Sequence, residues 1–342
     1  MNVLVIGNSF SQDAAAYLHQ AAASAGKELT IVNLYIGGCP LERHWQNIES
    51  DRAEYEYQLN GHILERRVSI RQAVMERNWD VIVTQQVSHD SGWAESYEPF
   101  LTLLCAWLRE KAPRAALYLH QTWAYEQDSD HNRYMRYHRN QEEMYRKLTA
   151  CYHDAAQRHG MRLIPSGDVI QALRQTAPFR YGEGGMSLCR DGYHMHLIYG
   201  RYALACTWAL TLCGVLPAAD YLPVSECDPS LTADADLLAL IRRTAQHRRR
   251  TADAERSQRC KRGIQPECDP SFLQRFTQNS TACKICHTAP PIIQNILSHK
   301  ALLDLPQNCS RSEKLLCIDS IHDMPFTRSA CPAWQRRRCR RH

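Results

Sequence analysis

Short apolar runs alternate with longer segments whose apolar residues recur at helical spacing, up to about residue 250. Such alternation is typical of a parallel sheet whose two faces are covered by helices. The predicted strands are Val3–Ile6, Leu29–Ile36, Trp79–Thr84, Ala115–Leu119 and Met161–Pro165. The predicted helices lie around residues 11–25, 66–77, 97–111, 134–159, 195–214 and 232–247. The pattern therefore predicts an α/β fold with a central parallel sheet.

Glycine and polar residues follow directly after four of the predicted strands. These residues are Ser9, Gly37-Gly38, Gln85-Gln86 and the segment His120–Trp123. In open parallel sheets, ligands bind outside the carboxyl ends of the strands. We therefore expect the four stretches to meet at one edge of the sheet and to form a site there. For Ser9, the alternative is a serine that only caps a turn or a helix.

Charge and cysteine content divide the chain near residue 250. The first 250 residues carry 26 basic and 28 acidic side chains, whereas residues 251–342 carry 15 basic and 8 acidic ones. The first part has no basic excess, so nucleic acid is not an expected partner. No apolar stretch reaches the roughly 20 residues of a membrane helix. Single cysteines within apolar segments, such as Cys105 and Cys206, favour a reducing, cytoplasmic location.

Residues 251–342 form a basic tail that contains 8 of the 15 cysteines. Its sequence shows little helical or strand periodicity, so we predict a domain over residues 1–250 and a tail of low order over 251–342. Cys283, Cys286 and His287 match the C-x-x-C-H pattern of haem attachment. A second ligand pair at a defined spacing is missing, so a chance match is favoured. The alternative is a thiol or metal-binding interaction segment.

A nucleophilic serine needs a base, and the stretch "CRDGYHMH" supplies a candidate. It places Asp191 three residues before His194, in a loop that precedes a long apolar pattern. At this spacing, the carboxylate can hold one imidazole nitrogen while the other nitrogen faces a nucleophile. A surface ion pair or a helix cap is the alternative. Together with Ser9, the spacing predicts a Ser-His-Asp triad.

The same stretches resemble the SGNH (GDSL-like) hydrolases. The resemblance rests on Gly7–Ser11, on the Gly37-Gly38 turn and on Asp191 with His194. More closely, "IGNSFSQDA", "LYIGGCPLERHW", "TQQVSHDSG", "HQTWAY" and "DGYHM" are similar to a poorly characterised bacterial branch, a domain of unknown function. The resemblance covers roughly residues 1–215. It implies a flavodoxin-like three-layer α/β/α fold and hydrolysis of esters, often acyl groups on carbohydrates, without a metal or a cofactor.

The resemblance also implies a role for each site residue. Ser9 would be the nucleophile, His194 the general base and Asp191 its orienting carboxylate. The oxyanion hole would use the N–H groups of Ser9 and Gly38. The asparagine block that usually supplies the third donor is absent, and "TQQVSHDSG" stands in its place. A glutamine amide can donate the same hydrogen bond, so Gln86 is the candidate and Gln85 the alternate.

Two aromatic residues after the fourth predicted strand, Trp123 and Tyr125, could line a sugar-sized pocket, and core packing is the alternative for each. Taken together, the residues predict a serine esterase that acts on a small-molecule or carbohydrate ester. One alternative is a lipase-like or thioesterase activity on an acyl chain. Another is a carbohydrate-binding module on the same scaffold without catalytic activity.

Overall fold

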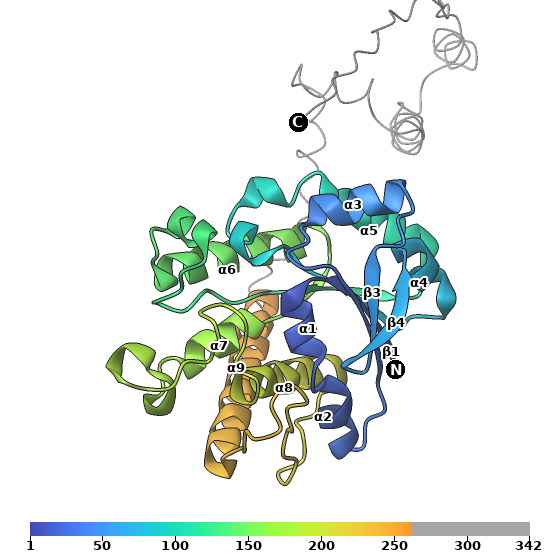
Figure 1. The fold of residues 1–342 in the computed structure, drawn as a ribbon. Coiled ribbons are helices and arrows are strands. Elements are labelled where there is room, and N and C mark those ends of the chain that lie inside the picture. The colour runs from blue at the N-terminus through green and yellow to red at the C-terminus, as the bar shows by residue number, and fades with distance from the viewer. Residues whose placement is uncertain (262–342) are drawn as a thin grey trace, which may run out of the picture. The chain divides into compact units, whose positions relative to one another are not determined.

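A computed structural model describes residues 1–261, in which helices cover both faces of a seven-stranded sheet (Figure 1). The strand order is β4-β3-β2-β1-β5-β6-β7. The strands are β1 (Asn2–Gly7), β2 (Thr30–Tyr35), β3 (Tyr55–Leu59), β4 (His62–Val68), β5 (Val81–Thr84), β6 (Ala116–His120) and β7 (Arg162–Ile164).

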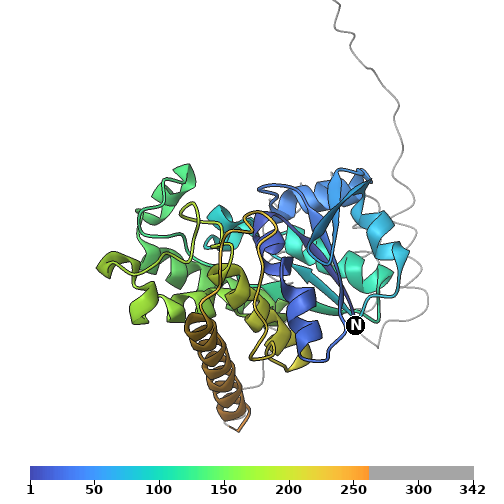
Figure 2. The same ribbon diagram turned by 60° about the horizontal axis from the view of Figure 1, so that its bottom comes forward.

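All the described helices except α6 fall into two groups by their mutual contacts. Helices α1, α2, α7 and α9 all contact α8, whereas α3 contacts α4 and α5. The two groups lie on opposite sides of the sheet (Figures 1 and 2). The helices are α1 (Ser9–Ala15), α2 (Leu18–Ser24), α3 (Leu41–Glu49), α4 (Ile70–Glu76), α5 (Phe100–Lys111), α6 (Gln141–Arg158), α7 (Ser166–Leu173), α8 (Tyr199–Cys213) and α9 (Ala235–Lys261). Within the described residues, no helix combines the length and the apolar composition that a bilayer crossing requires.

The five strands predicted from the sequence are confirmed as β1, β2, β5, β6 and β7. Strand β1 pairs in parallel with β2 and β5, and parallel pairing continues from β5 to β6 and from β6 to β7. All four residues of β5 are buried, as are Val3–Gly7 of β1. Strands that are buried on both faces appear as continuous apolar runs. The predicted α/β fold with a central parallel sheet is therefore confirmed.

A hairpin at one edge of the sheet was not predicted. Strand β3 is antiparallel to β2, and β4 is antiparallel to β3. Asn60 and Gly61 connect β3 to β4 with φ angles of 53° and 92°, and Asn-Gly is a strong signal for a two-residue hairpin turn. The first six residues of β4 are exposed, so this strand carries no alternation of apolar and polar residues. Helices α3 and α7 were also not predicted.

Helix α9 continues past residue 250, where the sequence predicts the end of the domain, and reaches Lys261. Leu238, Ile241 and Ala245 of α9 are each at most 3% exposed, and α9 contacts α7 and α8. The first half of this helix is therefore part of the hydrophobic core. The Cys283–Cys286–His287 motif and the rest of the predicted tail lie outside the described residues.

Removing α9 is expected to destabilise the protein. A chain that ends at residue 234 loses the burial of Leu238 and Ile241, at about 1.5–3 kcal/mol for each side chain, so its melting temperature should fall by roughly 10 °C or more. A chain that ends at residue 261 keeps α9 and is the control. Equal melting temperatures for the two truncated chains, measured by circular dichroism, would contradict the packing role of α9.

Candidate active site

Ser9 opens α1 directly after β1, at the carboxyl edge of the sheet. The preceding residue, Asn8, is buried and caps the helix, because its side-chain oxygen accepts a hydrogen bond from Phe10 N at 3.1 Å. Ser9 is partly exposed, and within residues 1–261 its hydroxyl makes no hydrogen bond to another residue. The cap therefore fixes the backbone around Ser9 and leaves the hydroxyl available.

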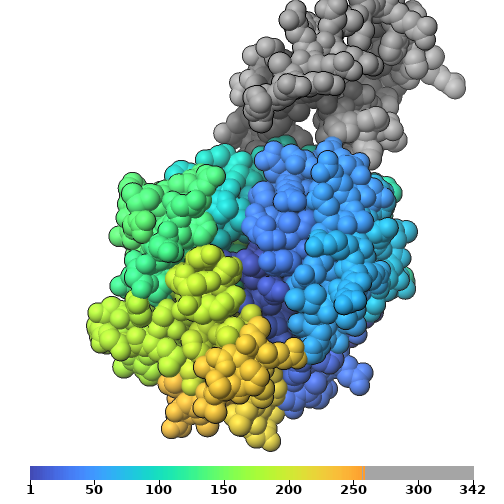
Figure 3. Space-filling view, viewed as in Figure 1, coloured from blue at the N-terminus to red at the C-terminus, as the bar shows by residue number. Residues whose placement is uncertain are grey.

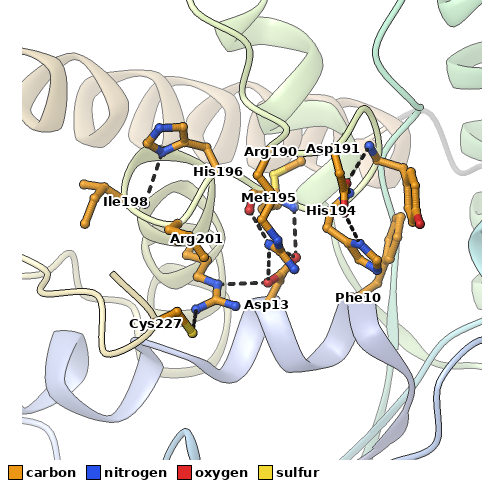
Figure 4. A network of polar contacts seen from close by, with 12 residues as sticks. Phe10, Asp13, Arg190, Asp191, His194, Met195, His196, Ile198, Arg201 and Cys227 are labelled. Atoms are coloured by element: carbon orange, nitrogen blue, oxygen red, sulfur yellow. Dashed lines mark hydrogen bonds and ion pairs between the residues drawn. The ribbon is translucent and has the colours of Figure 1, made fainter. Parts of the chain in front are cut away.

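The loop that precedes α8 holds Asp191 and His194 as a hydrogen-bonded pair. His194 Nδ1 lies 2.7 Å from Asp191 Oδ2, and the backbone N–H of His194 donates to Asp191 Oδ1 at 2.7 Å (Figure 4). Gly192 adopts a φ of 83° within this turn, in the left-handed region that favours glycine. The carboxylate accepts the proton of Nδ1, so Nε2 of His194 remains the basic nitrogen.

Hydrogen bonding sets the charge of Asp191. Partial burial opposes ionisation, but the hydrogen bonds from the side chain and backbone of His194, together with the electrostatic attraction of its imidazole, lower the pKa of Asp191 below its ordinary value. Asp191 therefore remains an ionised acceptor at neutral pH. Such a carboxylate orients an imidazole and stabilises it when it takes up a proton.

The side chain of Phe10 connects this pair to α1. Its ring stacks on Trp123, with ring centroids 4.1 Å apart, and meets the edge of His194 at 5.9 Å. Figure 4 shows the rings of Phe10 and His194 next to each other. Because Phe10 directly follows Ser9, the contact brings Asp191 and His194 to the first turn of α1. The face that carries these elements is hollowed, with N-terminal residues in dark blue at the bottom of a depression (Figure 3).

A buried carboxylate, Asp13 on α1, holds the Asp191–His194 loop from the other side. Its oxygens accept hydrogen bonds from the backbone N–H of Met195 at 2.8 Å and from Arg190 Nη1 at 3.0 and 3.1 Å. Arg201 Nε of α8 donates to the same carboxylate at 2.9 Å (Figure 4). Arg190 precedes Asp191 and Met195 follows His194, so Asp13 fixes both ends of the segment that carries the pair.

Sequence reasoning considered Asp13 only as a possible cap of the first helix, a role that Asn8 has instead, and did not identify its ion pairs. The available signal was a charged residue in an otherwise apolar helical pattern, since Asp13 precedes Ala14 and Ala15 and Arg201 stands among Tyr199–Ala209. The structure buries all of these residues. A charge on a buried face requires a partner of opposite charge. The pattern thus indicated that Asp13 and Arg201 each need a partner of opposite charge, but it did not show that they pair with each other.

The Gly37-Gly38 turn lies beside the β1–α1 junction, as the sequence predicts. Both glycines are exposed, and Gly38 has a φ of 60°. The next residue, Cys39, accepts a hydrogen bond through its carbonyl from Asn8 Nδ2 at 3.1 Å. This bond ties the turn to the residue that precedes Ser9. The assignment of the Gly38 N–H as an oxyanion donor remains a prediction.

Gln86, the expected third donor, points into the protein and is 1% exposed. Its Nε2 donates to the carbonyl and hydroxyl of Ser96 at 2.6 and 3.1 Å. Its Oε1 accepts from Leu41 N at 3.1 Å and from Val87 N at 2.8 Å. A buried amide has to satisfy both of its ends within the protein. The expectation that Gln86 faces the oxyanion is therefore not supported by this structure.

Gln85, the alternate donor, belongs to a second buried chain of hydrogen bonds. Its Nε2 donates to Asn8 Oδ1 at 2.8 Å, and His120 Nδ1 lies 2.6 Å from its Oε1. Burial lowers the pKa of His120 to about 3, so this imidazole is neutral and donates through Nδ1. Its Nε2 then accepts from the Ser166 hydroxyl at 2.9 Å. The chain supports the helix cap at Asn8 and gives His120 a structural role.

The expectation that Trp123 and Tyr125 stack on a sugar does not fit the structure, because both rings are 0% exposed. Trp123 Nε1 donates to the carbonyl of Tyr193 at 2.8 Å, and the hydroxyl of Tyr125 lies 2.8 Å from Ser88 Oγ. The ring of Tyr125 also lies 5.6 Å from that of Tyr193, so both residues instead support the loop that carries His194. Among the described residues, no three His, Cys, Asp or Glu side chains gather closely enough to hold a metal ion.

Replacing Gln86 by alanine is expected to lower stability rather than to affect catalysis selectively. The change leaves the buried N–H groups of Leu41 and Val87 without acceptors, at a cost of about 1–3 kcal/mol. Urea denaturation measures the loss, with Gln46→Ala on the exposed face of α3 as the control. A fully stable variant whose kcat falls by roughly 100–1000-fold would instead identify Gln86 as an oxyanion donor.

Removing the charge of Asp13 is expected to be more costly. Asp13→Asn leaves Arg201, whose side chain is 10% exposed, without its counter-charge, and breaking such a buried pair costs about 3–5 kcal/mol. Urea denaturation again gives the free energy of unfolding. The control is Glu183→Gln, which breaks an exposed pair with Arg180 and should cost less than about 1 kcal/mol. Equal losses for the two variants would contradict the role of Asp13.

Comparison with known proteins places the chain in a family. It matches the family model described as "Domain of unknown function (DUF4886)" over residues 2–223. A crystal structure of a DUF4886 family protein from Bacteroides uniformis is 36% identical, covers 72% of this chain and 92% of its own, and has a TM-score of 0.62. No curated protein matches the chain.

More distant structures are similar over a shorter part of the chain. A candidate SGNH hydrolase from Slackia heliotrinireducens is 21% identical over 62% of this chain and 98% of its own, with a TM-score of 0.41. The acetyl xylan esterase AlAXEase is 18% identical over 62% and 100%, also with a TM-score of 0.41. The match over residues 2–223 and the relative from Bacteroides uniformis decide the assignment: this chain belongs to the DUF4886 family.

Proposed function

We propose that this protein is a serine esterase that removes acyl groups, in the simplest case acetyl groups, from a carbohydrate. The observation that carries the proposal is the 2.7 Å contact between His194 Nδ1 and Asp191 Oδ2, beside the first turn of α1. This contact leaves Nε2 of His194 as a base next to the helix that begins with the partly exposed Ser9. A nucleophilic serine, an imidazole that takes its proton and a carboxylate that orients the imidazole form the machinery of acyl transfer.

In the proposed mechanism, Ser9 Oγ attacks the ester carbonyl carbon while Nε2 of His194 takes the hydroxyl proton. The carbonyl π electrons move to the oxygen, and Asp191 stabilises the imidazolium. Collapse of the tetrahedral intermediate breaks the bond to the alcohol, which leaves with the proton from His194. Water then attacks the acyl-serine through the same base, and the acid and free Ser9 are released.

The oxyanion in this scheme is bound by the backbone N–H groups of Ser9 and Gly38. Each such donor contributes about 2.7–4 kcal/mol to the stabilisation of the transition state. The amides of Gln85 and Gln86 are engaged inside the protein, so the scheme assigns no step to them.

The buried carboxylate of Asp13 favours catalysis over a carbohydrate-binding module without activity. A binding surface does not require an imidazole to be oriented, yet Asp191 holds His194 and Asp13 holds both ends of their loop. A lipase-like or thioesterase activity would use the same residues and would differ in the group that the pocket accepts.

Loss of the Ser9 hydroxyl is expected to abolish the activity. Ser9→Ala should lower kcat for 4-nitrophenyl acetate by about three or more orders of magnitude, and His194→Ala by a similar factor. The double variant should lose little more, because the members of a triad act as a unit. A fluorophosphonate probe should label the native chain at Ser9 and should not label Ser9→Ala. Mass spectrometry locates the labelled residue.

Ser50→Ala is the matched control, since Ser50 is an exposed serine at the end of α3 that bonds only to Gln46 O among the described residues. It should keep full turnover and full labelling. A Ser9→Ala chain that retains most of its turnover would contradict the proposal. A native chain that binds sugars but neither hydrolyses esters nor reacts with the probe would favour the binding module.

A further inference from the structure

A pocket of about 290 Å³ lies beside the Gly37-Gly38 turn, and the mechanism above does not use it. Its lining includes Tyr35 and Gly37 at the end of β2, Arg43 on α3, and Glu54, Glu56 and Arg67 from the β3–β4 region. The hairpin that the sequence did not predict thus supplies two of its four charged groups, Glu56 and Arg67. The volume is at the lower end of the range for small-molecule sites, about 300–1,000 Å³.

The pocket is connected to α1 through a chain of buried hydrogen bonds. Ser11 Oγ donates to Asn33 Oδ1 at 2.7 Å, and Asn33 Nδ2 donates to Gln58 Oε1 at 2.8 Å. Gln58 Nε2 in turn donates to Glu56 Oε1 at 2.6 Å. One oxygen of Glu56 is therefore fixed relative to the helix that carries Ser9. The other oxygen has no hydrogen-bond partner among the described residues.

Further polar groups in the lining are fixed by the protein. Arg43 Nη2 and Arg52 Nη1 bind the carboxylate of Glu54 at 3.1 and 3.4 Å. Arg67 Nη1 donates to the backbone carbonyl of Glu54 at 2.7 Å. Within residues 1–261, Nη2 of Arg67 makes no hydrogen bond, so it can donate to a ligand.

Tyr35 adds a phenol to the same wall. Burial, together with the negative charges of Glu56 and Asp13, raises the pKa of Tyr35, so the phenol stays protonated at neutral pH and can donate. The two arginines and two glutamates of the lining balance each other in charge. The pocket therefore offers donors and an acceptor without a net charge.

The structure assigns this pocket to the sugar ring that bears the ester, with Glu56 and Arg67 as the residues that select it; this assignment rests on the proposed esterase function. A sugar hydroxyl both donates and accepts hydrogen bonds, which matches a wall with a free carboxylate oxygen, a guanidinium and a phenol. A fatty chain would bury these polar groups without partners, at a large cost. The neutral balance of charge favours an uncharged sugar over a phosphorylated or uronic one.

The position of the pocket relative to Ser9 agrees with this assignment. Gly37 lines the pocket and is followed by Gly38, the proposed oxyanion donor. Cys39 then bonds to Asn8 at the β1–α1 junction. An ester whose carbonyl oxygen lies at Gly38 would therefore place either its acyl group or its alcohol group next to the pocket. The polar lining favours the alcohol group, which is the sugar.

Arg67→Met tests the assignment, with Arg66→Met as the matched control. Arg66 neighbours Arg67 on β4, but its guanidinium lies 4.4 Å from the ring centroid of Tyr57 and binds Glu76 at 3.0 Å, outside the pocket. Arg67→Met in the full chain should lower kcat/KM for mono-O-acetylated glucose and xylose, which keep their other hydroxyls free, by about 10–100-fold, mainly through KM. For 4-nitrophenyl acetate, which has no sugar, kcat/KM should change less than about twofold. Arg66→Met should change neither value.

A direct binding measurement separates this assignment from the proposed function. The methyl glycosides of glucose, xylose and N-acetylglucosamine are tested one by one by saturation-transfer NMR. At least one should bind the native chain and Arg66→Met, and should bind Arg67→Met at least about 10-fold more weakly. The pocket assignment is overturned if none of the sugars binds, or if every sugar that binds does so equally to all three proteins, even if 4-nitrophenyl acetate is hydrolysed. Binding lost in Arg67→Met without any ester hydrolysis would support the pocket and refute the esterase.

Discussion

The arrangement of the site depends on the ion pairs and hydrogen bonds of one buried carboxylate, that of Asp13. A carboxylate that is 0% exposed is tolerated inside a protein when opposite charges and hydrogen-bond donors surround it. Asp13 obtains them from Arg190 and Met195 in the loop before α8, and from Arg201 in α8 itself. The cost of leaving this charge unpaired therefore holds α1 against residues 190–201, which lie far away along the chain. Because the same loop carries Asp191 and His194, the Asp13 contacts also position the base.

The carboxyl edge of the sheet contains more polar groups than the proposed chemistry uses. Asn8, Gln85, His120 and Ser166 form one continuous chain of buried hydrogen bonds that supports the cap of α1. Gln86 forms a separate set of bonds that joins the segment after β5 to Ser96 and to the start of α3. These residues stabilise the loops around the site. They leave Ser9 and His194 partly exposed and Gly38 exposed, as the proposed mechanism requires.

The β3–β4 hairpin extends the sheet beyond the parallel strands and adds a polar wall beside the Gly37-Gly38 turn. Its two strands contribute Glu56 and Arg67, and the chain from Ser11 through Asn33 and Gln58 connects that wall to α1. The parallel strands β1 and β2 thus lead to Ser9 and Gly38 of the proposed mechanism, while the antiparallel addition carries the groups proposed to select the substrate. Chemistry and specificity are thereby assigned to different parts of one sheet.

The features that the sequence by itself determined are local ones. The apolar runs of β1 and β5 identify buried strands because such strands face helices on both sides. Asp191 and His194 are only three residues apart, so their spacing alone predicts the hydrogen bond between them. The exposed strand β4 lacked an apolar pattern, although Asn60-Gly61 marked its turn. Whether Gln86 and Trp123 face a ligand or the interior was decided by the tertiary structure, as was the pairing of Asp13 with Arg190 and Arg201. Burial depends on segments far apart in the chain, and burial determines which polar groups must bond within the protein and which remain free.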